Sequence, residues 1–169
     1  IYNPSVAILK VARMGHPVLR AKALPVPPAQ IVSSTVQRLI DDMFETMYEA
    51  PGIGLAATQV NIHRRIIVVD VSENRDQPHA FVNPVVTTFG AQIESDEGCL
   101  SVPGVYENVE RADSVTVTAL DENGARFTLN ASGLLATCIQ HEMDHLIGLL
   151  FLDRLVSKRN DLFRRKTYK

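Results

Sequence analysis

Hydrophobic residues recur at helical spacing in the first part of the chain, between positions 32 and 47. The apolar positions are Val32, Val36, Leu39, Ile40, Met43 and Met47. They fall on one face of a helix, which predicts an amphipathic surface helix. Ser34 and Gln37 have the spacing of a capping box at its start, and Pro51 and Gly52 follow its end.

Shorter apolar runs further along the chain have the composition of β-strands. The runs "RRIIVVDV" (64–71) and "HAFVNPVV" (79–86) are rich in β-branched residues, which indicates buried strands. In segment 114–129 apolar and polar residues alternate, stop at Asn123-Gly124 and resume. This pattern predicts a β-hairpin that turns at the Asn-Gly pair.

The segment "SGLLATCIQHEMDHLIG" (132–148) is apolar on nearly every side before its histidines. Ser132 is a candidate N-cap and Gly148 a candidate C-terminal residue, so we expect a central, buried helix. Strands and helices do not alternate along the chain as βαβ units would. The pattern therefore predicts an α+β fold in which antiparallel sheets pack around this helix.

Length and charge restrict the class of protein. The 169 residues fit one domain, covering positions 1–169, and 46% hydrophobic residues are enough for one sizeable core. A net charge of −2 lacks the basic excess of a DNA-binding protein. We find no apolar run of about 20 residues and no signal-peptide pattern, so we expect a cytoplasmic protein without a membrane partner.

The stretch "HEMDH" carries candidate chemistry on the buried helix. His141 and His145 stand four residues apart and lie on one helix face, so both imidazoles can point at a single metal ion. Glu142 is rotated too far to be the natural third ligand, but it can reach a water held on the metal. Two histidines on a surface helix without a metal are the alternative. Inside an apolar helix, however, each unpaired polar group would cost about 1–3 kcal/mol.

A catalytic metal site needs a third protein ligand and one open position. Cys99 in "EGCLS" is the candidate, although a small buried cysteine is the alternative interpretation. Cys138 fits that alternative better, since it is poorly oriented to share a metal with both histidines. In "GIGLAATQV", which is otherwise typical of a tight turn into a strand, Gln59 offers an amide donor able to stabilise an oxyanion.

Three stretches in this order, "GIGLAATQ", "EGCLS" and "HEMDH", resemble the peptide deformylase family, in its bacterial type. The resemblance covers most of the chain. It implies an α+β fold in which sheets enclose the histidine-bearing helix, and one Fe²⁺ per chain. It also implies an activity that removes the formyl group from the N-terminal formyl-methionine of nascent peptides and releases formate. Because the same ligands accept zinc or nickel, Zn²⁺ or Ni²⁺ can substitute for iron.

The resemblance also implies a role for particular residues. Cys99, His141 and His145 would hold the metal and leave one position for water or hydroxide, while Glu142 would shuttle the proton. The side-chain amide of Gln59 and the backbone N–H of Leu100 would meet the oxyanion. The substrate-binding residues would be Ile53, Gly54 and Gly98, which pair with the peptide backbone, and Leu134, Cys138 and the stem of Glu97, which line the methionine pocket.

Two positions depart from the family pattern. Thr58 replaces the proline of many relatives, and Thr137 replaces isoleucine or valine near the expected pocket wall. Three alternatives remain open: a metallopeptidase, a structural zinc module and an inactive deformylase-like scaffold. A metallopeptidase would normally take a downstream histidine or acidic ligand, and no histidine follows His145.

The last thirteen residues, 157–169, concentrate positive charge in a slightly acidic chain. The basic residues are Lys158, Arg159, Arg164, Arg165, Lys166 and Lys169. Such a run is usually a solvated helix face. The alternative is a contact with ribosomal RNA, as the family resemblance implies, which would bring the enzyme close to nascent chains. We expect the protein itself to be a monomer.

Overall fold

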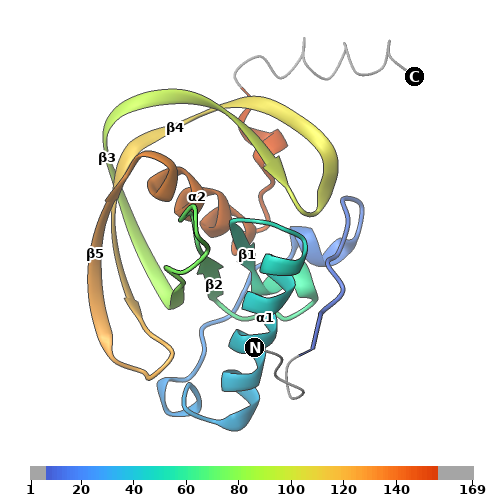
Figure 1. Ribbon diagram of the computed structural model, residues 1–169, viewed down its shortest axis with the longest axis vertical. Coiled ribbons are helices and arrows are strands. Elements are labelled where there is room, and N and C mark those ends of the chain that lie inside the picture. Colours follow the sequence, from blue (N-terminus) through green and yellow to red (C-terminus); the bar gives the residue numbers. More distant parts are fainter. Residues whose placement is uncertain (1–6, 156–169) are drawn as a thin grey trace.

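The computed structural model describes residues 7–155 and has an α+β architecture (Figure 1). Two α-helices, one five-stranded sheet and short 3₁₀ helices make up the described part of the chain. The α-helices are α1 (Ser34–Glu49) and α2 (Gly133–His145). The strands are β1 (Gly54–Ala56), β2 (Ile66–Val69), β3 (His79–Cys99), β4 (Val102–Leu120) and β5 (Arg126–Ser132). The 3₁₀ helices are Pro17–Arg20, Pro28–Gln30, Ala57–Val60 and Phe151–Arg154.

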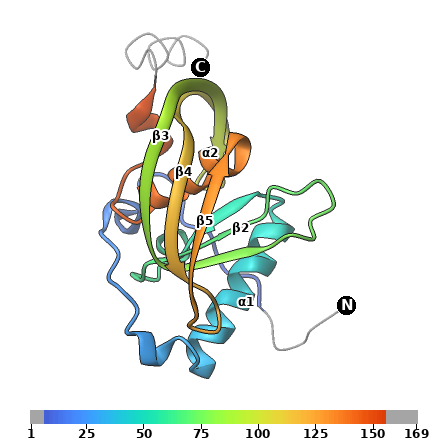
Figure 2. The same ribbon diagram turned by 90° about the vertical axis from the view of Figure 1, so that its left-hand side faces the viewer.

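The sheet follows chain order, β1-β2-β3-β4-β5, and all neighbouring strands are antiparallel. The α+β class is confirmed, but the expectation of more than one sheet is wrong. The reason is the length of β3, which pairs with β2 through its first residues and with β4 from Val82 to its end. One strand therefore connects the two parts. Figure 2 shows β3, β4 and β5 running side by side along one flank of α2.

Helix α2 lies between the long strands β3–β5 and the short strands β1 and β2 (Figure 1). Ala136 and Ile139 of α2, together with Leu146 directly after it, pack in a core cluster that includes Val115 and Val117 of β4. The helix begins directly after Ser132, as expected. It ends at His145 rather than Gly148, because the amides of Ile147 and Gly148 bond to carbonyls three residues back, which tightens the chain into turns.

Strand β2 is buried along its whole length because a helix covers each of its faces. Ile67 and Val69 pack in the cluster around α2, whereas Ile66 and Val68 pack in a second cluster with α1. Burial on both faces explains why the sequence of this strand is a continuous apolar run rather than an alternating one. The prediction of a buried strand here is confirmed.

Helix α1 is capped by a different residue from the predicted one. Ser33 is the N-cap, and its hydroxyl accepts a hydrogen bond from the amide of Val36 at 3.3 Å. Ser34 is the first helical residue, and the side chain of Gln37 donates to carbonyls of Ile31 and Glu122 instead of returning to the cap. Two adjacent serines leave the cap ambiguous in the sequence, and the path of the preceding chain decides between them.

The predicted hairpin is confirmed between β4 and β5. The turn closes through the amide of Gly124, which donates to the carbonyl of Asp121, and Gly124 has a φ of +82° that favours glycine. Within the described residues, no helix combines the length and apolar character needed to cross a bilayer.

Candidate metal centre

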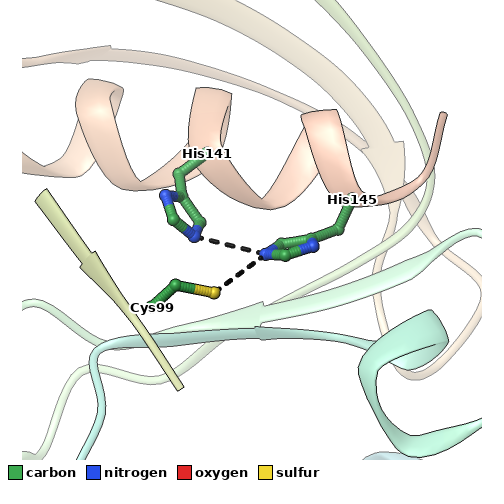
Figure 3. A group of neighbouring side chains, drawn as sticks. All are labelled: Cys99, His141 and His145. Atoms are coloured by element: carbon green, nitrogen blue, oxygen red, sulfur yellow. Dashed lines mark hydrogen bonds between the residues drawn. The ribbon is translucent and has the colours of Figure 1, made fainter. Parts of the chain in front are cut away.

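Three side chains from two elements meet beside α2. Cys99 is the last residue of β3, and His141 and His145 lie one turn apart on α2. The Nε2 atoms of the two histidines are 3.2 Å apart, and the Cys99 Sγ lies 3.4 Å from the His145 Nε2 (Figure 3). Ligand atoms of the three residues all lie within 4.8 Å of one another.

This arrangement fits a tetrahedral metal ion. Metal–nitrogen bonds of about 2.0–2.1 Å and metal–sulfur bonds of about 2.3 Å place two nitrogens about 3.3 Å apart and a nitrogen and a sulfur about 3.6 Å apart. The observed separations of 3.2 and 3.4 Å are close to both values. Three protein ligands leave the fourth position free, as in catalytic rather than structural sites. The residues therefore fit a catalytic cation.

A buried charge chain orients His141. The Nδ1 of His141 donates to the Glu97 carboxylate at 2.9 Å, which turns its Nε2 toward the other ligands. Glu97 in turn accepts two hydrogen bonds from the Arg111 guanidinium, at 2.6 and 3.0 Å. Arg111 also donates to Asp144 at 2.9 Å, and Asp144 accepts from Arg154.

The same charge chain adjusts the pKa values of its members. Burial opposes ionisation of Glu97, yet hydrogen bonds from His141 and Arg111 hold the pKa of this carboxyl below its usual value. Burial also disfavours the charged Arg111 guanidinium, but Glu97 and Asp144 raise its pKa. Glu97 is therefore a carboxylate that supports His141, a candidate metal ligand. Arg111 and Asp144 were not among the predicted site residues.

The two histidines have pKa values shifted in opposite directions. Burial disfavours a charged His141, but Glu142, Cys99 and Glu97 together raise the pKa of His141 to about 10. Burial and then the neighbouring charge of His141 hold the pKa of His145 well below its usual value. Negatively charged neighbours thus favour a positive charge on His141, whereas burial and the charge of His141 disfavour one on His145.

Glu142 faces the ligand atoms from the next position of α2. Its carboxylate lies 4.0 Å from the His141 Nε2, and its Oε1 has no hydrogen-bond partner among the described residues. Burial raises the pKa of Glu142 to about 7, although the positive charges of His141 and Arg111 act in the opposite direction. A buried carboxyl group with a raised pKa, and with one oxygen unpartnered among the described residues, is suited to carry a proton.

Gly54 of β1 leaves room for that carboxyl group. A Cβ at this position would lie 2.5 Å from the Glu142 Oε2 and 2.7 Å from the Cys138 Sγ, so no larger residue fits without displacing one of them. Cys138 is buried, and its thiol lies 3.5 Å from the Ile53 carbonyl. The structure therefore brings Gly54, Cys138 and Glu142 into direct proximity.

Gln59 has a fixed orientation beside Cys99. Its Oε1 accepts from the amide of Ala56 at 2.9 Å, so its Nε2 donors point the other way. That nitrogen lies 3.0 Å from the Ser101 hydroxyl and 3.6 Å from the Cys99 Sγ. Sequence reasoning had missed Ser101, although it is the last residue of the "EGCLS" stretch. The neighbouring Thr58 donates its hydroxyl to the His145 carbonyl at 3.2 Å, a bond that proline could not make.

The remaining predicted residues surround the cluster. Ile53 and Leu134 are exposed, and Leu134 stands one helical turn before Cys138 on α2. The Leu100 side chain packs closely against Gly52. The ring of Tyr106, which sequence reasoning also missed, lies against Gly98 and is 73% exposed. An aromatic residue in the opposite strand of a hairpin carries no local signal of this proximity.

An α+β fold with a Cys–His–His cluster beside a buried carboxyl group has the form of a hydrolytic metal centre. The model of the polypeptide deformylase family matches residues 8–161. The chain therefore belongs to the peptide deformylase family, whose members are enzymes that remove the N-formyl group from nascent peptides. The family resemblance stated from the three sequence stretches is confirmed.

Individual relatives agree with this membership. A peptide deformylase from Xylella fastidiosa (strain M12) is 56% identical over 164 residues, which is 96% of each chain. Peptide deformylase 2 from Xanthomonas campestris is 52% identical over 163 residues, again 96% of each chain. The crystal structure of a Synechococcus elongatus peptide deformylase in complex with actinonin has a TM-score of 0.85 and 42% identity, and covers 98% of this chain and 95% of its own. The crystal structure of a Legionella pneumophila peptide deformylase has a TM-score of 0.84 and 42% identity, and the match covers 96% of this chain and 99% of that one.

Proposed function

We propose that this chain hydrolyses the formamide of N-terminal formyl-methionine on nascent peptides, producing formate and a free amine, as one catalytic domain spanning residues 1–169. The observation that carries the proposal is the convergence of Cys99, His141 and His145 next to the unpartnered carboxyl oxygen of Glu142. A metal site and a proton carrier are the two parts that metal-assisted amide hydrolysis needs.

Cys99, His141 and His145 would hold one Fe²⁺, which Zn²⁺ or Ni²⁺ can replace because thiolate and imidazole ligands accept all three. A bound cation would act as a Lewis acid: it would polarise the formyl carbonyl and lower the pKa of a bound water. Glu97 keeps His141 in the orientation that exposes its Nε2, with 2.9 Å between the Glu97 Oε1 and the His141 Nδ1.

Glu142 moves the proton in the reaction. It accepts a proton as the water oxygen bonds to the formyl carbon, and it delivers that proton to the amide nitrogen as the carbon–nitrogen bond breaks. Burial raises the pKa of its carboxyl group, which favours uptake of the proton during the attack. Gly54 leaves the carboxyl group space to face the reacting atoms.

Two donors stabilise the oxyanion that forms during the attack. The Gln59 side-chain amide is held by Ala56 so that its N–H groups point toward Cys99. The backbone N–H of Leu100, the residue after the thiolate ligand, is the second donor. Donors that are in place before the reaction need no reorganisation, which makes their stabilisation of the developing charge effective.

The peptide lies along the edge of the sheet. Strand β1 is the first strand of the order, and among the described residues it pairs only with β2, which leaves its other edge free for an extended peptide. Backbone groups of Ile53, Gly54 and Gly98 bind the peptide. Leu134, Cys138 and the stem of Glu97 contact the methionine side chain.

The enzyme works as a cytoplasmic monomer where nascent chains emerge. The basic residues proposed to contact the ribosome, in segment 157–169, lie outside the described residues. A formylated N-terminus is a short-lived substrate, so docking near the ribosomal exit raises its effective concentration.

The test is hydrolysis of formyl-Met-Ala-Ser by protein purified anaerobically and loaded with Fe²⁺. We expect one formate for each free amine produced, and no cleavage of an internal peptide bond in acetyl-Met-Ala-Ser incubated in parallel. Cleavage of the acetylated peptide between Met and Ala would instead identify a metallopeptidase. Metal-loaded protein that releases neither formate nor amine would overturn the proposal.

A further inference from the structure

The segment before β1 is tied to a loop that is distant in sequence. The loop, residues 70–77, follows β2, and β1 precedes β2 by several residues. The amide of Asp70 donates to the Ile53 carbonyl at 2.9 Å. The guanidinium of Arg75 donates to the Gly52 carbonyl through Nη2 and to the Asp70 carbonyl at 3.0 Å through Nη1. One planar group therefore connects the backbone of both segments.

Surrounding residues hold the Arg75 side chain in place. Its guanidinium lies 5.0 Å from the ring centroid of Tyr48, on the last turn of α1. The Tyr48 hydroxyl donates to the Asp70 carboxylate at 2.7 Å, and this carboxylate also accepts from the amides of Ser72 and Gln77. Asp70 is fully buried. The end of α1, the loop and the segment before β1 thus form one connected cluster.

The backbone at Arg75 is unusual for a side chain of this size. Its φ is +58°, in the left-handed region that disfavours non-glycine residues. Glycine would adopt this conformation more easily but would provide no guanidinium. The position therefore keeps an unfavourable backbone conformation together with a side chain that bridges two carbonyl groups.

The position of the β1 backbone matters because its first residue, Gly54, touches the carboxyl group proposed to be catalytic. The Gly54 Cα is so close to Glu142 that an added Cβ would lie 2.5 Å from the Oε2. The strand has only three residues, and the chain bends directly before it. Such a short edge strand needs support from outside its own ladder to keep its backbone groups in register for a peptide.

We propose that Arg75 is a positioning residue for substrate binding, which sets the orientation of the Gly52–Ile53–Gly54 backbone by bridging the Gly52 and Asp70 carbonyls. The inference rests on the proposed function, in which Ile53 and Gly54 bind the peptide. Among the described residues, Arg75 bonds to the Gly52 and Asp70 carbonyls and lies over the Tyr48 ring, and none of these residues is a proposed metal ligand. Arg75 should strengthen peptide binding equally in the ground state and in the transition state, because it shapes the edge along which the peptide lies.

The test compares Arg75→Gly and Arg75→Lys with Arg65→Ala as a matched control. Glycine accepts the left-handed backbone but removes the whole side chain, while lysine keeps the charge and an aliphatic stem but cannot form the two-pronged bridge. Arg65 is similarly half-buried and donates at 2.9 Å to the backbone carbonyl of Pro84 in β3, a strand that is not adjacent to β1 in the sheet. All proteins are loaded with Ni²⁺ and assayed with formyl-Met-Ala-Ser.

We expect KM to rise about tenfold in both Arg75 variants, with kcat within about twofold of the parent, as for a loss of uniform binding. Metal content should stay at one ion per chain, and Arg65→Ala should keep the parental KM. Hydrogen exchange in residues 50–57 should become faster in the Arg75 variants and not in the control. Exchange does not depend on activity, so it tests the inference even if the parent releases no formate.

Two results would overturn the inference. One is a parental KM and parental exchange of residues 50–57 in folded Arg75→Lys or Arg75→Gly. The other is an equal rise of KM in Arg65→Ala, which would show a general loss of structure rather than positioning of β1. Absence of formate release from the parent would count against the proposed function alone.

Discussion

At the scale of single residues, neighbouring side chains of the proposed metal site have different roles. His141 and His145 are the proposed nitrogen ligands, whereas Glu142, adjacent to His141, keeps an oxygen without a partner among the described residues. The Glu97 carboxylate bonds to the Nδ1 of His141 and so orients the ring whose Nε2 is the proposed ligand. In the proposed function, ligation, proton transfer and orientation thus belong to different side chains, and each can be removed separately.

Replacing Glu142 with glutamine should remove the proton carrier and keep the ligands. We expect kcat to fall by about 10²–10⁴-fold, the usual contribution of general acid–base catalysis. Metal content should remain one per chain, since Glu142 binds no metal in the proposed site. Stopped-time assays of formate release together with metal analysis check both statements. A variant that loses its metal would show that Glu142 belongs to the ligand set.

Replacing Glu97 with glutamine should weaken metal binding by about 10–100-fold, the usual effect of losing a group that orients a ligand. The His141 imidazole would lose its carboxylate partner, and Arg111 would lose a charged partner in a buried position. Competition with a chromogenic chelator measures the affinity. Glu94→Gln, on an exposed position of the same strand, is the control and should bind metal like the parent. Equal affinities in the two variants would contradict the orienting role.

At the scale of elements, the two helices have different tasks. Helix α2 carries His141, Glu142 and His145 and is enclosed by the sheet, so its position is fixed by packing from several strands. Helix α1 carries none of the proposed catalytic residues. It buries Ile40, Met43 and Met47 against β2 and contributes Tyr48 to the cluster around Arg75. Leu55 of β1 lies in the same cluster, so the stability of α1 also bears directly on this edge strand.

The N-cap of α1 gives a test at this scale. Ser33→Ala removes the hydroxyl that accepts from the Val36 amide and should cost about 1 kcal/mol of unfolding free energy. Ser34→Ala, at the first helical residue, should change stability by less than about 0.5 kcal/mol. Urea unfolding of the two variants with equal metal content measures both. A larger loss in Ser34→Ala would restore the capping box predicted from the sequence.

At the scale of the whole molecule, metal binding and folding are linked. The proposed ligands come from the end of β3 and from α2, which are far apart in sequence and meet only in the folded chain. A cation that binds these three residues therefore stabilises the folded state relative to the unfolded state. It also satisfies a cluster in which Glu97, Glu142 and Cys99 attract positive charge.

Metal removal should accordingly lower the melting temperature. Protein treated with a chelator and dialysed should unfold at a lower temperature than loaded protein. Adding Ni²⁺ at about 100 times its dissociation constant should restore about 2.7 kcal/mol of stability. Differential scanning calorimetry in buffers with and without Ni²⁺ checks this. Cys99→Ser serves as the control, because a hydroxyl is a poorer ligand than a thiolate and should reduce the gain. An identical gain in that variant would place the bound ion elsewhere.

Much of the structure around the site followed from local patterns. The helical period of 32–47, the turn at Asn123-Gly124 and the i, i+4 spacing of His141 and His145 depend on residues within one or two turns of each other. Backbone geometry alone connects such residues, so their arrangement could be predicted from the sequence. The three family stretches added Cys99 and Gln59, and their proximity to the histidines agrees with the structure.

Tertiary structure decided the rest, because it depends on pairing between distant segments. The sequence contains no signal that β3 is long enough to join all strands into one sheet, or that Arg111 reaches Glu97 across the β3–β4 hairpin. Arg75 likewise meets the Gly52 carbonyl only because β1 and β2 are paired. Register and the burial of charges are properties of the assembled fold, in which one residue's environment is set by segments with which it shares no local pattern.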